Sequence, residues 1–193
     1  MLLKQIAEYA VREQTAKLPK EVIHHAKRAV VDWYASLLPG SRVAPATLLE
    51  QALADELDHG RARLASGRRA TVRAAALING AASHAVEFDD IWRDAVYHPA
   101  SPVISAALAA AQAQGASGER FLRGVIVGYE VSTRIGDAVM PSHYKFWHTT
   151  GTVGTFGAAA AVATLLGCNR EQFVHALGNA GTFAAGLQQA FRS

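Results

Sequence analysis

A short segment of the chain gathers carboxylates and histidines in a pattern that suits acid–base chemistry. It runs from Asn79 to Pro102, within a sequence that is rich in alanine and only 18% charged. Its acidic and histidine side chains are Glu87, Asp89, Asp90, Asp94, His84 and His98. Because gathering charge among apolar neighbours costs free energy, such a cluster indicates a functional site. Histidine changes its charge near pH 7, so the segment predicts proton transfer.

The position of the two adjacent aspartates leaves two interpretations open. A helix expected over residues 72–88 would end on Asp89 and Asp90, where the helix dipole is negative. Two carboxylates there cost about 0.3–1 kcal/mol each unless a cation such as Arg93 or His98 compensates them, which favours a functional role. The alternative is structural: the aspartates cap the next turn and pair with Arg93 at the surface.

A second group of candidate residues follows at residues 143–157. It contains His148, after which a helix is expected to begin with Thr149, Thr150 and Gly151. The free backbone N–H groups at a helix N-terminus can bind a carboxylate, and threonine hydroxyls add further donors. We therefore expect Thr149, Thr150 and Gly151 to bind the substrate.

Two other interpretations of this second segment are weaker. Its glycines recur every three residues without a preceding strand, which matches no phosphate-binding pattern and instead favours close packing of helices. A zinc site made from His143, His148, His98 and an aspartate would fit no standard ligand spacing. We therefore expect no metal ion at this site.

The overall composition excludes several classes of protein. The chain has 193 residues, half of them apolar, and carries no basic stripe interleaved with aromatic residues, so nucleic acid is not an expected partner. The single cysteine, Cys168, excludes an intrachain disulfide and a cysteine-ligated iron–sulfur cluster. Charges at Lys4, Glu8 and Arg12 are unlike a signal peptide, and the longest apolar stretch is too short to cross a bilayer. We expect a cytoplasmic protein that does not enter the membrane.

Apolar side chains recur with helical spacing along nearly the whole chain, which predicts one all-α domain, a multihelical array of packed helices. Ser117 is an expected N-cap, and Asn169 and Gln172 are expected to form a capping box. Residues 61–71 contain the turn signal Ser66-Gly67 and are expected to form a small hairpin or loop. The helices are expected at residues 2–13, 20–37, 46–58, 72–88, 103–114, 119–139 and 151–166, and after Asn169.

Three ordered motifs in this chain resemble the MmgE/PrpD family. They are LINGAASHAVEFDD followed by His98-Pro99, then GYEV at residues 128–131, then WHTTGTVGTFGAAAAVATLLG from Trp147. This family includes 2-methylcitrate dehydratase, cis-aconitate decarboxylase and an iminodisuccinate epimerase. The resemblance implies a helical domain completed by a smaller α+β lid domain. We therefore expect residues 1–193 to be the N-terminal helical domain of a longer two-domain enzyme, with the lid domain absent from this chain.

The resemblance also assigns residues to a site. The family's two catalytic histidines fall on His98 and His148. Its acidic cluster falls on Glu87, Asp89 and Asp90, of which Glu87 departs from the aspartate that the family usually has. We expect Asp89 and Asp90 to be catalytic and Glu87 to bind substrate. In the decarboxylase-like branch a threonine follows the two aspartates, and Ile91 stands there in this chain, which weakens a decarboxylase assignment.

The reactions of the resembled family share the loss or gain of a proton at a carbon next to a carboxylate. A route without a cofactor needs a base that titrates near pH 7 and fixed donors around the substrate carboxylates. We expect a dehydratase of a small di- or tricarboxylate, similar to 2-methylcitrate dehydratase, in which His98 and His148 share proton transfer. The alternatives are decarboxylation or epimerisation of a related polycarboxylate, and a catalytically inactive helical domain for dimerisation. The resemblance implies a homodimer in either case.

Overall fold

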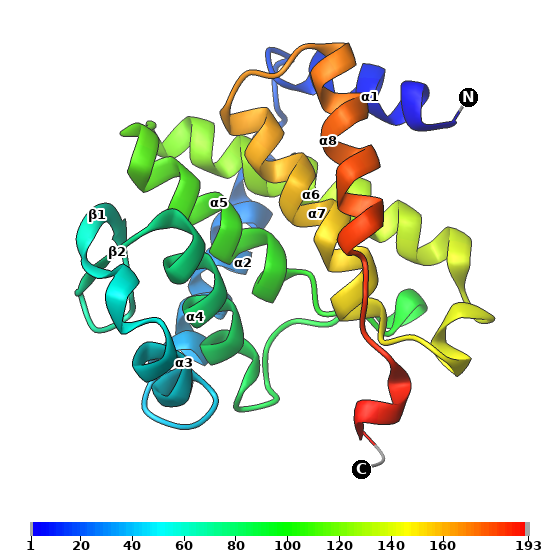
Figure 1. The fold of residues 1–193 in the computed structure, drawn as a ribbon. Helices are drawn as coiled ribbons and strands as arrows, with labels where there is room; N and C mark the ends of the chain where they lie inside the picture. The colour runs from blue at the N-terminus through cyan, green and yellow to red at the C-terminus, as the bar shows by residue number, and fades with distance from the viewer. Residues whose placement is uncertain (1, 192–193) are drawn as a thin grey trace.

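The computed structural model describes residues 2–191, which fold mainly into packed helices (Figure 1). The predicted all-α, multihelical fold is confirmed, with one small two-stranded hairpin added to it. The helices are α1 (Leu2–Glu13), α2 (Lys20–Gly40), α3 (Ala46–Ala52), α4 (Val72–His84), α5 (Ala100–Gln114), α6 (Gly118–Val139), α7 (Thr149–Leu165) and α8 (Arg170–Phe183). The hairpin consists of β1 (Leu57–Arg63) and β2 (Arg69–Ala70), and short 3-10 turns η1 to η4 lie between or after these elements at 54–56, 93–95, 143–145 and 188–191.

Local sequence signals place several helix starts correctly. Ser117 caps α6, because its hydroxyl accepts the Arg120 N–H at 3.3 Å. At α8 the predicted capping box is confirmed: the Asn169 side chain accepts the Gln172 N–H at 3.0 Å, and the Gln172 side chain accepts the Asn169 N–H at 2.9 Å. Both helices are therefore fixed at their N-termini by residues that can be read from the sequence.

The predicted helix over residues 46–58 is wrong in its second half. α3 ends at Ala52, and the chain enters β1 at Leu57. Asp58 and Gly60 have φ angles of +66° and +78°, which an α-helix does not accommodate. The expected hairpin is confirmed, although it begins earlier than predicted. Asn79 of α4 anchors it, since the Asn79 amide bonds to the backbone of residues 63 and 65 at 2.9 and 3.1 Å.

Two helix ends next to the candidate site differ from the prediction. α4 ends at His84 rather than at residue 88, and Glu87 has a φ of +56°, outside helical geometry. α5 begins at Ala100, before the proline that was expected to open it, because the Asp90 carboxylate accepts the Ala100 N–H at 3.0 Å. The segment between these two helices is therefore a longer loop that is held by side chains.

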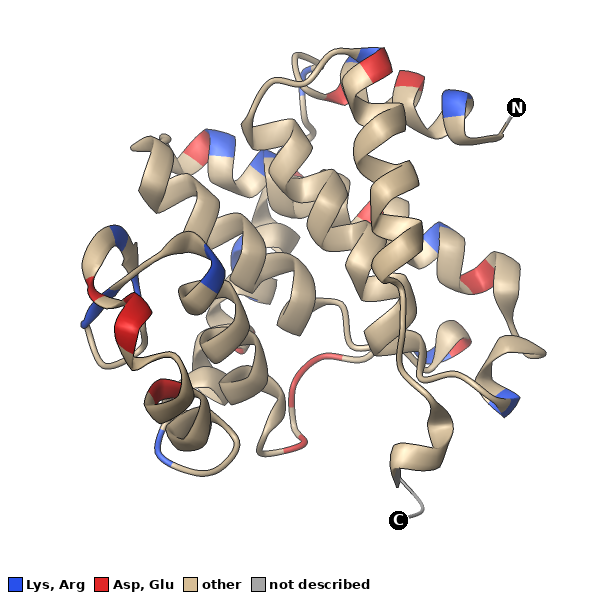
Figure 2. Ribbon diagram, in the orientation of Figure 1, with Lys and Arg blue, Asp and Glu red and all other residues tan. Residues whose placement is uncertain are grey.

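α5 lies at the centre of the molecule, with α2, α4, α6 and α7 packed against it. α5 and α7 contain no charged residue, and both ribbons are uniformly tan in Figure 2. Large side chains such as Trp33, Ile104 and Leu165 are fully buried around α5. The burial of apolar surface around these two helices is the main force that fixes the position of their N-terminal ends.

Glycines let α7 approach its neighbours closely, as their spacing in the sequence predicts. A Cβ atom on Gly157 would lie 2.7 Å from Val103 Cγ2 and 2.8 Å from Ser132 Oγ. A Cβ atom on Gly154 would lie 2.6 Å from Pro102 Cγ. These distances are shorter than van der Waals contact, so the packing of α7 on α5 and α6 requires residues without a side chain.

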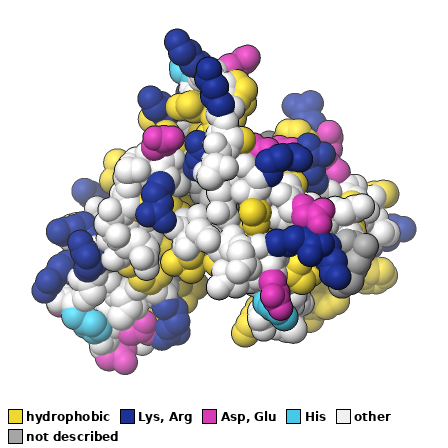
Figure 3. All heavy atoms as spheres, turned by 90° about the horizontal axis from the view of Figure 1, so that it is seen from above, with side chains coloured by type: hydrophobic (Ala, Val, Ile, Leu, Met, Phe, Trp, Pro, Cys, Tyr) yellow, Lys and Arg dark blue, Asp and Glu magenta, His cyan; other side chains and the backbone are white. Residues whose placement is uncertain are grey.

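The surface carries charge in small separated groups. On the face shown in Figure 3, basic side chains alternate with acidic and uncharged ones and form no continuous stripe. Among the described residues, no helix is long and apolar enough to span a membrane.

Candidate active site

Two histidines from different parts of the chain meet at one aspartate, and a third histidine ring lies near them. His84 is the last residue of α4, His98 lies just before α5, and His148 is the N-cap of α7. The ring centroid of His84 lies 4.8 Å from that of His98 and 6.3 Å from that of His148. The structure thus places both histidines predicted from the sequence near a third one, His84.

Asp89 is the carboxylate at the centre of this cluster, and its side chain is 0% exposed. His84 Nδ1 lies 3.0 Å from Asp89 Oδ2 and 3.1 Å from Asp89 Oδ1, and His98 Nδ1 lies 3.5 Å from Oδ1. Burial by itself raises the pKa of the Asp89 carboxyl, but the contacts with both histidines outweigh burial and lower the pKa to about 2. Asp89 is therefore ionised at neutral pH and is held between two imidazoles.

The two predicted catalytic histidines have opposite electrostatic settings. The contact with the Asp89 carboxylate raises the pKa of His98, although burial opposes it. Burial lowers the pKa of His148, and the neighbouring His84 and His98 lower it further. His98 thus favours the imidazolium form, whereas His148 favours the neutral ring that can accept a proton.

Asp90 has a different environment from its neighbour. Its Oδ1 accepts the Ala100 N–H at 3.0 Å, and its Oδ2 accepts the Tyr129 hydroxyl of α6 at 2.9 Å. Burial raises the pKa of the Asp90 carboxyl to about 6, against the effect of these two hydrogen bonds. Asp90 therefore links the loop to α5 and α6, and these bonds do not involve the histidine cluster.

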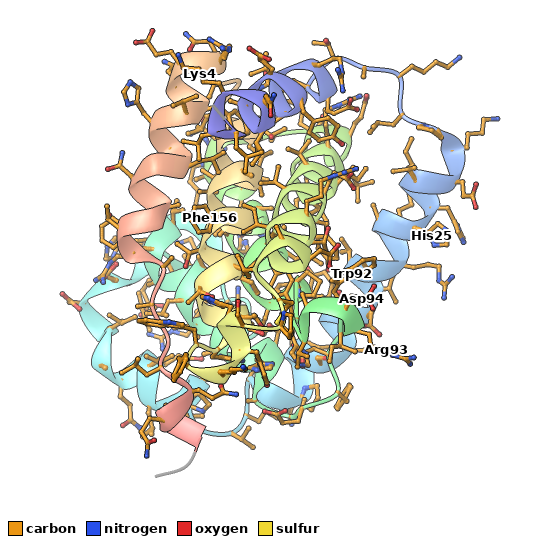
Figure 4. The ribbon with its side chains drawn as sticks, turned by 90° about the vertical axis from the view of Figure 1, so that its right-hand side faces the viewer. Lys4, His25, Trp92, Arg93, Asp94 and Phe156 are labelled. Carbon is orange, nitrogen blue, oxygen red and sulfur yellow. The ribbon has the colours of Figure 1, made fainter. Side chains whose placement is uncertain are left out.

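The surface alternative for the aspartates is wrong for Asp89, because its side chain is fully buried against His84 and His98. Arg93 and Asp94 are exposed in the 3-10 turn of residues 93–95, on the side of the molecule where α2 passes, as their labels in Figure 4 show. The compensating cation next to Asp89 is therefore a histidine and not Arg93.

The first turn of α7 lies against the loop that carries His98. The Thr149 hydroxyl donates to the Val96 carbonyl at 2.5 Å, and the Thr150 hydroxyl accepts the His98 N–H at 3.2 Å. Gly151 lies against the backbone of residues 185 and 186, where a Cβ atom would come within 2.8 Å of the Ala185 carbonyl oxygen. Both threonine hydroxyls thus fix the loop beside α7, and the backbone N–H groups of the turn remain the candidates for contact with an anion.

Glu87 stands at the edge of the cluster. It is exposed and its negative charge raises the pKa of both His98 and His148. A solvent-accessible carboxylate next to the two histidines can adjust their protonation and can contact a bound molecule.

A cavity lies against this cluster at the aspartates. Its volume is about 760 Å³, and α2 forms one wall with His24, Arg28 and Asp32. Residues 88–91 form the other wall, so Asp89 and Asp90 both border the cavity. Asp89 also contacts the histidines. His84, His98 and His148 are not among the residues that line this cavity. We therefore locate the candidate site by the histidine–aspartate contacts and not by the volume of the cavity.

Sequence reasoning did not assign a role to His84 or Tyr129. His84 lies in the LINGAASHAVEFDD motif, and Tyr129 lies in the GYEV motif, so both belong to motifs that the sequence had already singled out. Their partners Asp89 and Asp90 lie on a loop whose path the sequence did not predict. The sequence therefore contained both residues within its motifs, but it did not show which aspartate each of them would contact.

Histidine and aspartate are also common metal ligands, and the ring and carboxylate atoms of His84, Asp89 and His98 lie within 4.8 Å of one another. His143, which the zinc interpretation would use, instead bonds the Thr152 hydroxyl at 2.7 Å through Nε2. Because the first three side chains are already paired with one another, we interpret them as an acid–base cluster.

The fold and this cluster define a helical domain that presents two histidines of opposite protonation preference next to a helix N-terminus. Comparison with known proteins gives the family: residues 4–193 match the MmgE/PrpD N-terminal domain, and the chain belongs to the MmgE/PrpD family.

Several curated proteins are similar to this chain. It is 32% identical over 196 residues to the cis-aconitate decarboxylase-like protein oryM of Aspergillus oryzae, covering 96% of this chain and 41% of that protein. It is 32% identical over 194 residues to cis-aconitate decarboxylase of Aspergillus terreus, covering 96% of this chain and 40% of that protein. The human cis-aconitate decarboxylase is 35% identical over 117 residues, 55% of this chain and 24% of that protein. The chain thus spans about two-fifths of the length of the fungal relatives it matches.

Proposed function

We propose that the protein is a lyase that acts on a small di- or tricarboxylate by acid–base chemistry without a cofactor. The observation that carries this proposal is the presence, at the first turn of α7, of His148, whose pKa is lowered by burial, near His98, whose Nδ1 lies 3.5 Å from the Asp89 carboxylate. Membership of the MmgE/PrpD family and similarity to cis-aconitate decarboxylases support the same class of reaction.

His148 is the general base in this proposal, and His98 is the general acid. The neutral His148 ring takes a proton from the carbon next to a substrate carboxylate, and negative charge accumulates on the substrate. The His98 imidazolium and the N–H groups at the start of α7 stabilise that charge. His98 can then deliver its ring proton to the leaving or recipient atom, which completes the exchange.

Dehydration of a hydroxy-tricarboxylate such as 2-methylcitrate uses all of these groups. Water leaves when His98 protonates the hydroxyl oxygen after His148 has taken the carbon-bound proton, so the proton count balances. Decarboxylation is the second candidate, because the similar curated proteins are cis-aconitate decarboxylases. In that reaction carbon dioxide leaves and a histidine protonates the resulting carbanion. Ile91 supplies no hydroxyl after the aspartates, which favours dehydration.

The test uses the full-length product of the gene that contains this sequence, because a lid domain is part of the proposal. The protein is incubated separately with 2-methylcitrate, citrate and cis-aconitate, and products are followed by NMR. Substitutions His148→Asn and His98→Asn should each lower kcat by about 10²–10⁴-fold. His175→Asn on α8 is the matched control, because the His175 side chain is 73% exposed and lies outside the cluster.

Full turnover in His148→Asn would refute the assignment of the base. Absence of turnover by the wild-type protein on all three substrates would favour the catalytically inactive helical interaction domain.

A homodimer is part of the same proposal. Val31 and Leu38 of α2 are 69% and 54% exposed, which supports an apolar contact surface on the helical domain. Light scattering on the full-length protein should give twice the monomer mass, and a monomer mass would contradict the homodimer.

A further inference from the structure

Asp89 is a single buried carboxylate with two imidazole partners, and the partners do not hold it equally. His84 Nδ1 reaches both oxygens of Asp89, at 3.0 and 3.1 Å. His98 Nδ1 lies 3.5 Å from one of them, and this buried nitrogen makes no hydrogen bond of full geometry within residues 2–191. The stronger hold on the carboxylate thus belongs to His84, the histidine that the proposed mechanism does not use.

We propose that His84 is a positioning residue, which shares the Asp89 carboxylate with His98 and thereby weakens the grip of His98 on its ring proton. His84 Nδ1 faces both oxygens of the carboxylate, so its N–H stabilises the same negative charge that holds the proton on His98. Because the Asp89 side chain is 0% exposed, water does not compete with the two rings for the carboxylate in the wild-type protein. The two rings therefore share the negative charge of this one carboxylate.

The charged groups around His98 determine how strongly it holds its ring proton. From its own loop it faces Glu87, Asp89 and Asp90, all of which favour the imidazolium. From α4 it faces the His84 ring at a centroid distance of 4.8 Å. The His84 ring also lies 6.3 Å from the His148 ring, nearly parallel to it at an interplanar angle of 22°. After burial, the neighbouring His84 and His98 lower the pKa of His148. Towards His98, His84 acts through the Asp89 carboxylate that both rings approach.

Removal of His84 has a definite expected direction. Asp89 would keep one imidazole partner in a buried site, and its full charge would act on His98. His98 would then bind its proton more tightly and release it less readily. The proposed role of residue 84 requires a hydrogen-bond donor directed at the Asp89 oxygens. The amide nitrogen of asparagine occupies nearly the place of the histidine Nδ1, so His84→Asn should still donate to Asp89.

The first experiment measures the proton directly and needs no substrate. The ring nitrogens of the wild-type, His84→Ala and His84→Asn full-length proteins are followed by ¹⁵N–¹H NMR between pH 5 and pH 9. We expect the His98 pKa to rise in His84→Ala and to return towards the wild-type value in His84→Asn. His25→Asn on α2, where the His25 side chain is 60% exposed, should leave it unchanged.

Two outcomes overturn the proposal. One is a His98 pKa in His84→Ala that is unchanged or lowered, and the other is an equal rise in His84→Ala and His84→Asn, which would show that donation to Asp89 is not the cause. The wild-type spectra give an independent check that does not depend on the folding of a variant. His84 must carry its proton on Nδ1, and an unprotonated Nδ1 would also overturn the proposal.

The kinetic consequence rests on the proposed function. With His98 as general acid, the basic limb of the pH profile of kcat should move to higher pH in His84→Ala, and kcat at pH 7 should fall about tenfold with KM little changed. An NMR result as expected, in a protein that turns over none of the substrates, would refute the proposed function and leave the role of His84 intact. A shifted His98 pKa with an unshifted kinetic limb would show that His98 is not the acid.

Discussion

The close approach of α7 to its neighbours can be tested at Gly157, because that contact positions the helix whose N-terminus carries His148. In Gly157→Ala the new Cβ atom would meet Val103 Cγ2 at 2.7 Å and Ser132 Oγ at 2.8 Å. Overpacking of this kind costs about 1–3 kcal/mol. The gain in helix propensity from glycine to alanine returns about 1 kcal/mol, so the net loss of stability is smaller than the steric cost.

A second glycine separates these two contributions. Gly178 lies in the middle of α8, and a Cβ atom added there would meet no neighbouring atom within 4 Å, so Gly178→Ala should gain the propensity without the clash. Urea denaturation of both variants should therefore give free energies of unfolding that differ by about 1–3 kcal/mol, with Gly157→Ala the less stable.

The source of the clash can be checked in a double variant. Val103→Ala removes the methyl group nearest to the new Cβ atom, so its cost should be smaller in the Gly157→Ala background than alone. Equal stabilities of the two glycine variants, within about 0.5 kcal/mol, would refute the reasoning that α7 is held at this distance by its glycines.

Two further predictions concern the loop between α4 and α5. The folded-state pKa of Asp90, about 6, lies above its ordinary value of 3.8, so ionisation of Asp90 costs native stability as pH rises through this range. Each unit of difference between the folded-state pKa of about 6 and the ordinary value of 3.8 is worth about 1.4 kcal/mol, so Asp90→Asn should gain about 3 kcal/mol relative to the wild type between pH 4 and pH 8. Urea denaturation at both pH values measures this gain, and a constant difference would contradict the burial argument. Thr149→Val should cost about 1–3 kcal/mol, because the Val96 carbonyl loses its 2.5 Å donor, whereas Thr182→Val on the exposed face of α8 should change stability by less than about 0.5 kcal/mol in the same assay.

The sequence predicted the helices most reliably where a local signal marked their ends. The Ser117 cap and the Asn169 capping box act through hydrogen bonds within three residues, so the sequence alone suffices to place them. The glycine spacing of α7 predicted close helix packing for the same reason, since it needs no knowledge of the partner helix. The hairpin after α3 was placed too late because its first strand carries positive φ angles at Asp58 and Gly60, and Asp58 gave no warning of this.

The end of α4 shows what local signals do not decide. No glycine or proline follows His84 directly, and the helical pattern continues to residue 88. Beyond the helix end, Asp89 turns back to His84, whereas Asp90 bonds to groups outside α4. The Tyr129 hydroxyl that binds Asp90 lies 39 residues further along the chain, and the Ala100 N–H lies 10 residues further. Such bonds exist only after α5 and α6 have packed.

The sequence by itself determined that this chain is a helical member of its family, and it singled out His98, His148 and two aspartates as candidate catalytic residues. Both follow from residue types and motif order, which are local information. Only the tertiary structure decided how they are used. It placed His84 near both histidines, directed the Asp89 side chain at His84 and directed the Asp90 side chain at Tyr129. The side chains of adjacent loop residues point in different directions. The partner that each side chain contacts depends on how helices far apart in the sequence pack together.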